Sequence, residues 1–346
     1  MYIIVGATQM LGAHLAYAML KQGQRVRAVM CSKCDDKNFT KHILSYYSGD
    51  YENLFNEIEW VEACPLDLEA MTEAFQGGEA VFYCRKPFLS TKHSFDDNIE
   101  EIRNVITAIR ENSVKYFYYI SSLDVLGQEP DYKLITENSQ RNPKAKYPTM
   151  TMLNYMCEME VLRALNEDIE GAIANTGIIL GPGDWKTDSS RLFPLTLTYN
   201  YYAKGVTGFV SVNDVVKSLM TMARKKITGE RFILVSENLS YHQVLKLMTQ
   251  KLNAPEPKKY ANSFRMTIYK ACYIGKSLLT GRRPILDNAY FNRMTSFEIF
   301  SNKKSIGTLI VNYEPIEQVI EETAQIYLKE NSSEIKKTYK FARNFF

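Results

Sequence analysis

The sequence begins Met1-Tyr-Ile-Ile-Val-Gly-Ala-Thr-Gln-Met-Leu-Gly12, and this stretch decides the fold. A short apolar run ends at Gly6, a second glycine follows at Gly12, and residues Ala13 to Leu20 have the composition of a helix. A strand, a tight turn and a helix therefore follow one another without a spacer. The first N–H groups of such a helix lack internal partners and attract an anion, and glycine lets that anion approach the backbone. The stretch predicts a dinucleotide-binding turn.

The turn departs from the usual dinucleotide-binding pattern at one position. Gln9 stands where such turns carry their middle glycine, so a side chain projects into the place where a phosphate would approach. Thr8 and the backbone can still surround a phosphate, and Gln9 itself can donate a hydrogen bond to it. This pattern weakens binding without excluding it. The residues that we expect to contact a cofactor at the turn are Gly6, Thr8, Gln9, Met10, Leu11 and Gly12.

Length, composition and charge restrict the class of protein. The chain has 346 residues, of which 45% are hydrophobic and 23% charged, as is typical of a folded globular protein. Its 42 basic and 39 acidic residues give a net charge of only +3, which argues against a nucleic-acid or membrane partner and is compatible with a small anionic ligand. The first strand begins at Tyr2 and leaves no room for a signal peptide, and no apolar run is long enough to span a bilayer. We therefore expect a cytoplasmic protein.

Segments typical of strands and of helices alternate after the first helix. This alternation predicts an α/β fold with a parallel sheet and right-handed crossovers. The expected segments are a strand over Gln24 to Met30, a strand over Glu59 to Cys64, a helix ending at Phe75, a strand over Ala80 to Tyr83, a helix over Asp97 to Glu111 and a strand over Lys115 to Ser122.

A series of motifs in order carries a family resemblance. They are the turn Val5 to Gly12, Leu66-Asp67-Leu68, Asn98 to Val105, Val114 to Ser122 with Val125-Leu126-Gly127, Gly177 to Asp184, Gly208 to Val216, Gly229 to Val235 and Tyr313-Glu314-Pro315. With these motifs the chain resembles the extended short-chain dehydrogenase/reductases of the NAD-dependent epimerase/dehydratase and dihydroflavonol-reductase type. The resemblance implies a Rossmann-type, doubly wound parallel sheet with a smaller C-terminal substrate-binding region.

The resemblance also implies a domain organisation. Residues 1–178 would form the NAD(P)-binding Rossmann core, with the sheet completed by residues 207–236. Residues 179–206 and 239–315 would form the substrate-binding region, and residues 316–346 a C-terminal helix and tail. Because family members pair through the helices before and after the serine-bearing strand, we expect a homodimer by analogy.

Cofactor contacts are implied beyond the turn. In many NAD-binding proteins an acidic residue after the second strand takes the ribose hydroxyls, whereas a basic one accommodates a 2′-phosphate. This chain has Cys31-Ser-Lys33 there, which favours NADP slightly over NAD, although Lys33 is also compatible with a solvated loop. The expected contacts outside the turn are Cys31, Lys33, Asp67, Leu68, Cys84, Arg85 and Thr176.

Two cations follow the fourth strand, where the family usually has small residues. Arg85 and Lys86 can clamp a phosphate or an acidic substrate. They can equally fill the cleft or be ordinary loop cations. The sequence leaves these readings open.

The family's catalytic residues are only partly present. Family members use a serine, a tyrosine and a lysine four residues after the tyrosine, because positions i and i+4 share a helix face and the ammonium lowers the pKa of the phenol. Ser122 matches the serine. One register places Met152 and Met156 at the tyrosine and lysine positions, and another keeps Tyr147 but places Thr151 where the lysine should be. Neither register contains the pair.

Two hypotheses follow. The first is a pseudoenzyme that binds a dinucleotide or another phosphate ligand and has lost or altered catalysis. The alternative is an active NAD(P)-dependent oxidoreductase or sugar epimerase that uses Ser122 and Tyr147. Cys31-Ser-Lys-Cys34 has the spacing of redox and metal sites, but without a second pair or a nearby histidine we assign no metal.

Overall fold

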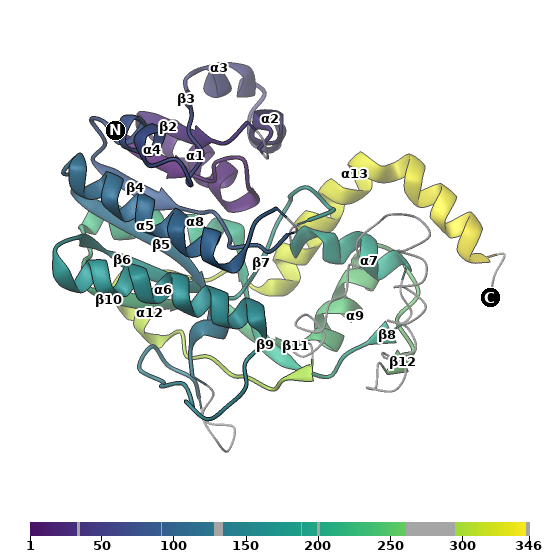
Figure 1. The fold of residues 1–346 in the computed structure, drawn as a ribbon. Coiled ribbons are helices and arrows are strands. Elements are labelled where there is room, and N and C mark those ends of the chain that lie inside the picture. Colours follow the sequence, from purple (N-terminus) through teal and green to yellow (C-terminus); the bar gives the residue numbers. More distant parts are fainter. Residues whose placement is uncertain are drawn as a thin grey trace.

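The computed structural model describes residues 1–32, 35–90, 92–127, 134–187, 189–198, 201–260 and 295–343. A seven-stranded parallel sheet forms the centre of the molecule (Figure 1). Its strand order is β3-β2-β1-β4-β5-β6-β10, so the direction of winding reverses between β1 and β4. Cofactor crevices of open α/β sheets lie at this reversal, outside the carboxyl ends of the strands. The strands are β1 (Tyr2–Val5), β2 (Val26–Met30), β3 (Glu59–Glu62), β4 (Ala80–Tyr83), β5 (Tyr116–Ser122), β6 (Glu170–Thr176) and β10 (Glu230–Leu234).

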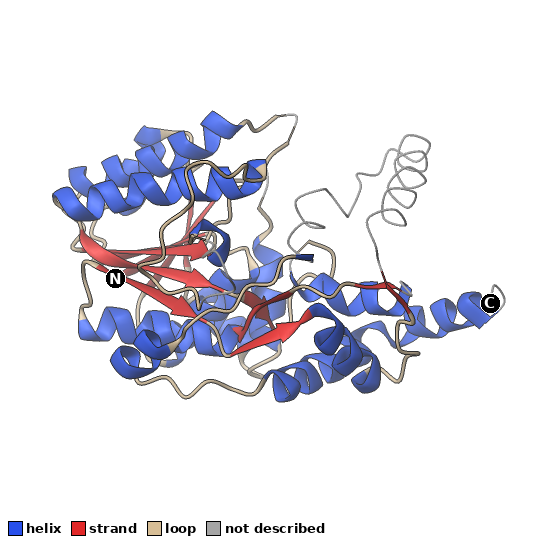
Figure 2. Cartoon of the chain, turned by 90° about the horizontal axis from the view of Figure 1, so that it is seen from below, coloured by secondary structure: helices blue, strands red, loops and turns tan. Residues whose placement is uncertain are grey.

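Helices cover both faces of this sheet (Figure 2). Strand residues point alternately to the two faces, so Phe82 packs into one apolar core while Val81 and Tyr83 pack into the other. The first core is closed by α1 (Met10–Lys21), α2 (Lys37–Ser45) and α8 (Val212–Lys225). The second is closed by α4 (Leu68–Phe75), α5 (Phe95–Glu111) and α6 (Thr149–Glu167). The remaining short helices are α3 (Tyr51–Asn56) and α12 (Lys303–Leu309).

A smaller region lies beside the carboxyl end of the large sheet (Figure 1). It contains a three-stranded sheet, β11-β9-β7, and a two-stranded sheet, β12-β8. A third apolar core joins α7, α9 and α13 around residues such as Phe193, Met248 and Ile320. The elements are β7 (Ile178–Leu180), α7 (Leu192–Thr198), β8 (Tyr201–Tyr202), β9 (Val206–Ser211), β11 (Glu237–Ser240), α9 (Tyr241–Lys251), β12 (Lys259–Tyr260) and α13 (Ile316–Arg343).

The structure confirms the α/β, doubly wound class and the expected order of its first five strands. Two further strands, β6 and β10, complete this sheet. Within 207–236, however, β9 lies in the separate three-stranded sheet, because it pairs with β7 and β11. The division into a core and a substrate-binding region stays a prediction. Over the described residues, no helix is both long and apolar enough to cross a membrane.

Candidate functional site

The turn between β1 and α1 is built around two glycines. Gly6 has a φ of +88°, and a Cβ there would lie 2.8 Å from the backbone nitrogen of Arg85. A Cβ on Gly12 would lie 2.1 Å from the carbonyl oxygen of Gly6. Gly6 therefore permits the left-handed turn against the end of β4, and Gly12 lets α1 approach that turn closely. Both glycines have a structural reason in this chain, whatever ligand the turn binds.

The turn also carries a buried polar group without a partner. Thr8 is 9% exposed, and its Oγ1 forms no hydrogen bond. Next to it, Met10 and Leu11 begin α1, whose first-turn N–H groups have no acceptor within the helix. A buried hydroxyl is normally hydrogen-bonded, so an unpaired one at a helix N-terminus fits an absent anionic ligand. These groups suit a dinucleotide phosphate.

Gln9 spans the crevice at this point. Its side-chain oxygen accepts a hydrogen bond of 3.3 Å from the backbone N–H of Lys86, which follows β4. It does not cap α1. The carboxamide therefore lies between the two sides of the crevice, as the sequence led us to expect of a side chain at this position. One long hydrogen bond holds it, and rotation of the side chain would open the path to the helix N-terminus.

Acidic groups flank the end of β2, and sequence reasoning missed them. Asp35 accepts a hydrogen bond of 2.8 Å from the backbone N–H of Cys31, and Glu62 accepts one from the hydroxyl of Ser32. Asp35 lies four residues after Cys31, the position at which the dinucleotide-binding motif has its acidic residue. Its place beside the end of β2 therefore follows only from the fold of the loop. Lys33, on which the slight preference for NADP rested, lies outside the described residues.

Asp67 and Leu68 stand after β3, where the resemblance places the adenine. The carboxylate of Asp67 caps α4 by accepting a hydrogen bond of 3.1 Å from Ala70. Leu68 is 37% exposed and begins that helix. Capping of α4 is a sufficient local reason for an aspartate at position 67. Their contact with adenine stays a prediction.

Arg85 is buried in an ion-pair cluster. Its Nη1 lies 3.6 Å from Asp35 and its Nε 3.4 Å from Glu101 of α5, and Glu101 also lies 3.6 Å from His93. Burial raises the pKa of Glu101, although the Arg85 and His93 charges oppose this rise. Because two carboxylates face the Arg85 guanidinium, its charge is largely neutralised within the protein. Among the alternatives that the sequence left open, the structure favours a role for Arg85 in ion pairs within the protein rather than in ligand binding. Lys86 is exposed.

Ser122 ends β5 beside a buried polar network. Asn175 of β6 donates hydrogen bonds to the carbonyl of Ser122 (3.2 Å) and to Glu158 of α6 (2.7 Å). Glu158 is 1% exposed and pairs with Arg231 at 2.6 Å. Burial raises the pKa of Glu158, partly offset by the Arg231 charge. Thr176 donates a hydrogen bond to the carbonyl of Ser121 at 3.2 Å. The network fixes the backbone that carries Ser122.

The structure shows which side chains of α6 meet the loop after Ser122. Thr151 and Asn154 point to Asp124, with distances of 3.2 Å from Thr151 Oγ1 and of 3.1 and 3.2 Å from Asn154 Nδ2. Met156 is 37% exposed. The side chains that hydrogen-bond Asp124 are therefore a hydroxyl and an amide, neither of which is an acid or base near neutral pH. Tyr155 of the same helix packs beside them on the cluster of Leu123 and Val125. The signal that could have found this arrangement is the spacing of the buried residues Leu153, Cys157, Val161 and Ala164.

Tyr147 precedes α6, which begins at Thr149. Its hydroxyl donates to the carbonyl of Asn142 at 3.2 Å and accepts from the backbone N–H of the same residue at 3.0 Å. Both hydrogen-bonding directions of the phenol are thus used by its own loop. A role for Tyr147 in proton transfer stays a prediction.

The cysteines at the sheet edge are buried thiols. Cys31 and Cys84 directly follow β2 and β4 and are 4% and 2% exposed. Burial raises the pKa of Cys84, so it is not a reactive thiolate. Cys34 lies outside the described residues. In the part of the chain that the structure describes, no three His, Cys, Asp or Glu side chains are grouped to hold a metal ion.

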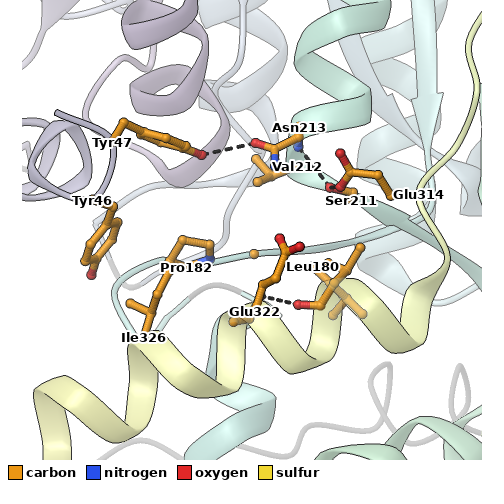
Figure 3. Close-up of a pocket in the computed structure, with 13 residues that line it drawn as sticks. Tyr46, Tyr47, Leu180, Pro182, Ser211, Val212, Asn213, Glu314, Glu322 and Ile326 are labelled. Carbon is orange, nitrogen blue, oxygen red and sulfur yellow. Dashed lines mark hydrogen bonds between the residues drawn. The ribbon is translucent and has the colours of Figure 1, made fainter.

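A cavity of about 90 Å³ lies between α2, α8 and α13. Figure 3 shows Tyr47 pointing to Asn213 and Glu322 reaching from α13 into the space. The Tyr47 hydroxyl also lies 2.5 Å from Nδ1 of His14 on α1, whose Nε2 lies 2.9 Å from the carbonyl of Pro182. Because a carbonyl only accepts, the proton of the neutral imidazole lies on Nε2, and the Tyr47 hydroxyl lies within hydrogen-bond distance of both Nδ1 and the Oδ1 of Asn213. The cavity is lined by Tyr46, Tyr47, Leu180, Gly181, Pro182, Ser211, Val212, Asn213, Glu314, Val319, Glu322, Thr323 and Ile326.

Comparison with known proteins agrees with this geometry. The model of the NAD dependent epimerase/dehydratase family matches residues 2–234. The chain is 22% identical to the sterol demethylase protein B of Methylococcus capsulatus over 264 residues, 74% of this chain and 76% of that protein. It also resembles the solved structure of gox2253, with 19% identity, a TM-score of 0.77 and coverage of 95% and 98% of the two chains. The Bordetella bronchiseptica enzyme WbmH, solved in complex with NAD+, has 14% identity, a TM-score of 0.69 and coverage of 95% and 98%.

Proposed function

The chain belongs to the NAD dependent epimerase/dehydratase family, and we propose that it binds a nicotinamide dinucleotide at the β1–α1 turn without the family's tyrosine–lysine proton transfer. The observation that carries the proposal is the face of α6 next to Ser122. Thr151 and Asn154 hydrogen-bond the carboxylate of Asp124 there, and neither can serve as the phenol or the ammonium that the family's chemistry requires. The protein is thus a dinucleotide-binding member of the family with lost or altered catalysis.

The turn supports the binding half of the proposal. The unpaired hydroxyl of Thr8 and the first N–H groups of α1 would hold the pyrophosphate, and Asp67 with Leu68 would border the adenine. When bound, a nicotinamide cofactor supplies a hydride acceptor or donor. The chain's own part is to orient that group through the turn and to hold the substrate side through the network behind Ser122. The related fold of WbmH was solved in complex with NAD+, which supports dinucleotide binding by a fold of this kind.

NAD is the better match among the two cofactors. The carboxylates of Asp35 and Glu62 flank Cys31 and Ser32, the position after β2 that meets the ribose in Rossmann folds. A 2′-phosphate would approach the carboxylate of Glu62 and that of Asp35, whose charge is offset by Arg85, whereas ribose hydroxyls can donate to both carboxylates. We therefore propose NAD, in place of the slight preference for NADP that the sequence suggested.

Thermal stabilisation and calorimetry with NAD+, NADH, NADP+ and NADPH test the binding proposal. We expect saturable stabilisation that follows RT ln(1 + [L]/Kd), with NAD(H) bound more tightly than NADP(H). In Gln9→Gly, which lacks the carboxamide across the crevice, affinity should rise about threefold to tenfold, because no side chain has to be displaced. No stabilisation by any of the four at high concentration would sink the proposal.

The alternative, an oxidoreductase or epimerase that uses Ser122 and Tyr147, needs its own test. Incubation of the protein with NADH or NAD+ and a panel of ketones, aldehydes and sugar nucleotides, followed by cofactor absorbance and product chromatography, should give no turnover. Turnover that disappears in Tyr147→Phe would support the alternative. Turnover that survives in Tyr147→Phe would point to altered chemistry without this phenol.

A further inference from the structure

A second arginine, Arg141, lies on the substrate side of the sheet and differs from Arg85 in its partners. Its guanidinium carbon lies 3.7 Å from the ring centroid of Tyr147 and 4.5 Å from that of Tyr155. Nη2 lies 3.7 Å from the sulfur of Met152 on α6. These are cation–π and thioether contacts, which hold the guanidinium without neutralising its charge.

Arg141 has an unsatisfied cationic donor. Its Nη1 is shielded from solvent and has no hydrogen-bond partner among the residues that the structure describes. Within the described ranges it pairs with no carboxylate, whereas Arg27, Arg85, Arg103, Arg110, Arg163 and Arg231 each pair with at least one. Burying a charged donor without an acceptor is costly, because its lost hydration is not replaced. An incoming oxyanion would supply the missing acceptor.

The chain holds Arg141 close to the candidate site. A Cβ on Gly127 would lie 2.0 Å from the carbonyl oxygen of Gln140, so the segment before Arg141 packs directly on the loop that follows Ser122. Tyr155 neighbours Asn154, which holds Asp124. Tyr155 also packs against the apolar cluster that contains Leu123 and Val125. The guanidinium therefore borders the ends of β5 and α6.

We propose that Arg141 is an anion-binding residue and that the ligand on this side carries a carboxylate or a phosphate. The rings of Tyr147 and Tyr155 stack on the guanidinium and Met152 contacts Nη2, so Nη1 is the donor left for an oxyanion, in the planar geometry that arginine offers and lysine does not. The inference rests on the proposed function only in taking this edge of the sheet as the substrate side. The sequence suggested Arg85 as a residue that binds an anionic ligand. Because carboxylates neutralise Arg85, we assign this role to Arg141 instead.

Inorganic phosphate and acetate serve as probes, without any dinucleotide. Their effects on the melting temperature are compared with sodium chloride at equal ionic strength. We expect saturable stabilisation by at least one probe, and at least about tenfold weaker binding in Arg141→Gln, because a hydrogen bond to a charged group is lost. Phosphate alone would indicate a phosphate ester and acetate alone a carboxylate. No saturable effect of either probe on the wild type would overturn the proposal.

Two matched variants locate the effect. Arg163→Gln removes an exposed arginine of α6 that is already paired with Glu160, and it should bind the probes like the wild type. Thr8→Val reports any phosphate that binds at the dinucleotide turn instead, so the component of probe binding that depends on Arg141 should persist in it. If binding survives in Arg141→Gln but is lost in Thr8→Val, the anion sits at the turn and the proposal is wrong.

Arg141→Lys covers the case in which Arg141→Gln does not fold. It keeps the charge but loses the planar fork, so reduced probe affinity supports the proposal and unchanged affinity contradicts it. Dinucleotide affinity is measured separately on the same variants. A protein that binds phosphate through Arg141 but no dinucleotide would refute the proposed function alone.

Discussion

Single side chains indicate whether the turn between β1 and α1 is kept for ligand binding or only for the fold. A Cβ on Gly6 or Gly12 would lie 2.8 or 2.1 Å from a backbone atom, so the fold itself requires both glycines. Their presence therefore does not indicate ligand binding. The Thr8 hydroxyl is different, because it has no hydrogen-bond partner among the described residues. A buried hydroxyl without a partner lowers the stability of the free protein, and a bound ligand would supply the missing hydrogen bond. Such a group therefore indicates a role in binding rather than in folding.

Thr8→Val separates these roles. The substitution keeps the shape and removes a hydroxyl that has no partner in the free protein, so the free energy of unfolding should change by less than about 1 kcal/mol. The dissociation constant for NAD should rise about tenfold, because the hydrogen bond to the phosphate is lost. Urea denaturation and calorimetry measure the two quantities.

A buried threonine far from the turn provides the control. Thr249 of α9 is 1% exposed and donates to the carbonyl of Lys246 at 2.8 Å. Thr249→Val should lose about 1 kcal/mol of stability and keep its NAD affinity. Thr8→Val that is destabilised and yet binds NAD normally would make Thr8 a structural residue only.

At the scale of elements, His14 links three segments that are distant in sequence. It lies on α1 and joins Tyr47, which follows α2, and Pro182, which follows β7. An added Cβ at Gly181 would lie 3.2 Å from the Met10 methyl, so the loop after β7 also contacts the first residue of α1. Burial lowers the pKa of His14 from 6.5 to about 4. The imidazole is neutral in the folded protein near neutral pH.

This shift gives a pH dependence with a defined sign. Below pH 6.5 the unfolded chain takes up a proton at His14 before the folded one does, so stability is full above that pH and falls as the pH is lowered to about 4. The loss from this residue is at most about 3 kcal/mol. His14→Gln should lack this component, because its amide can donate to Pro182 but does not titrate.

Urea denaturation between these pH values measures the effect. His242→Gln is the control, since His242 lies on the surface side of α9, with its side chain 37% exposed. That variant should keep the wild-type dependence on pH. An identical pH profile for His14→Gln and the wild type would show that His14 does not titrate as described.

At the scale of the whole molecule, the apolar core of the smaller region is separate from the two cores that cover the large sheet. The chain's two tryptophans report on different parts. Trp60 packs at the edge of the core that contains α1, and Trp185 packs on Phe193 and Tyr327 in the core that contains α13. The expected homodimer belongs to this scale as well and stays a prediction, which sedimentation velocity would test.

Ile320→Ala should weaken the smaller region selectively. Ile320 is fully buried in α13, so its truncation should cost about 2–5 kcal/mol. Thermal unfolding followed by Trp185 fluorescence, in a Trp60→Phe background, should shift further than unfolding followed by Trp60 in a Trp185→Phe background. Ile306→Ala, at a 44% exposed position of α12, is the control and should shift neither. Equal shifts of both probes would instead show that the molecule unfolds as one unit.

The sequence by itself determined the fold class, the order of its first five strands and the position of the dinucleotide turn. These depend on local properties: the period of apolar residues, the two glycines and the lengths of the segments. The position of Ser122 at the end of β5 follows from the same local pattern, whereas its catalytic role stays a prediction.

Only the tertiary structure decided which side chains meet at the site. The face of α6 that meets Asp124 depends on the rotation of that helix about its axis, and a shift of two residues turns a different set toward the sheet. Asp35 and Glu101 come from two distant segments that only the assembled sheet brings within 3.6 Å of the Arg85 guanidinium. The same assembly neutralises Arg85 and leaves Arg141 without a carboxylate, because the charge that a ligand meets depends on neighbours in space rather than in sequence.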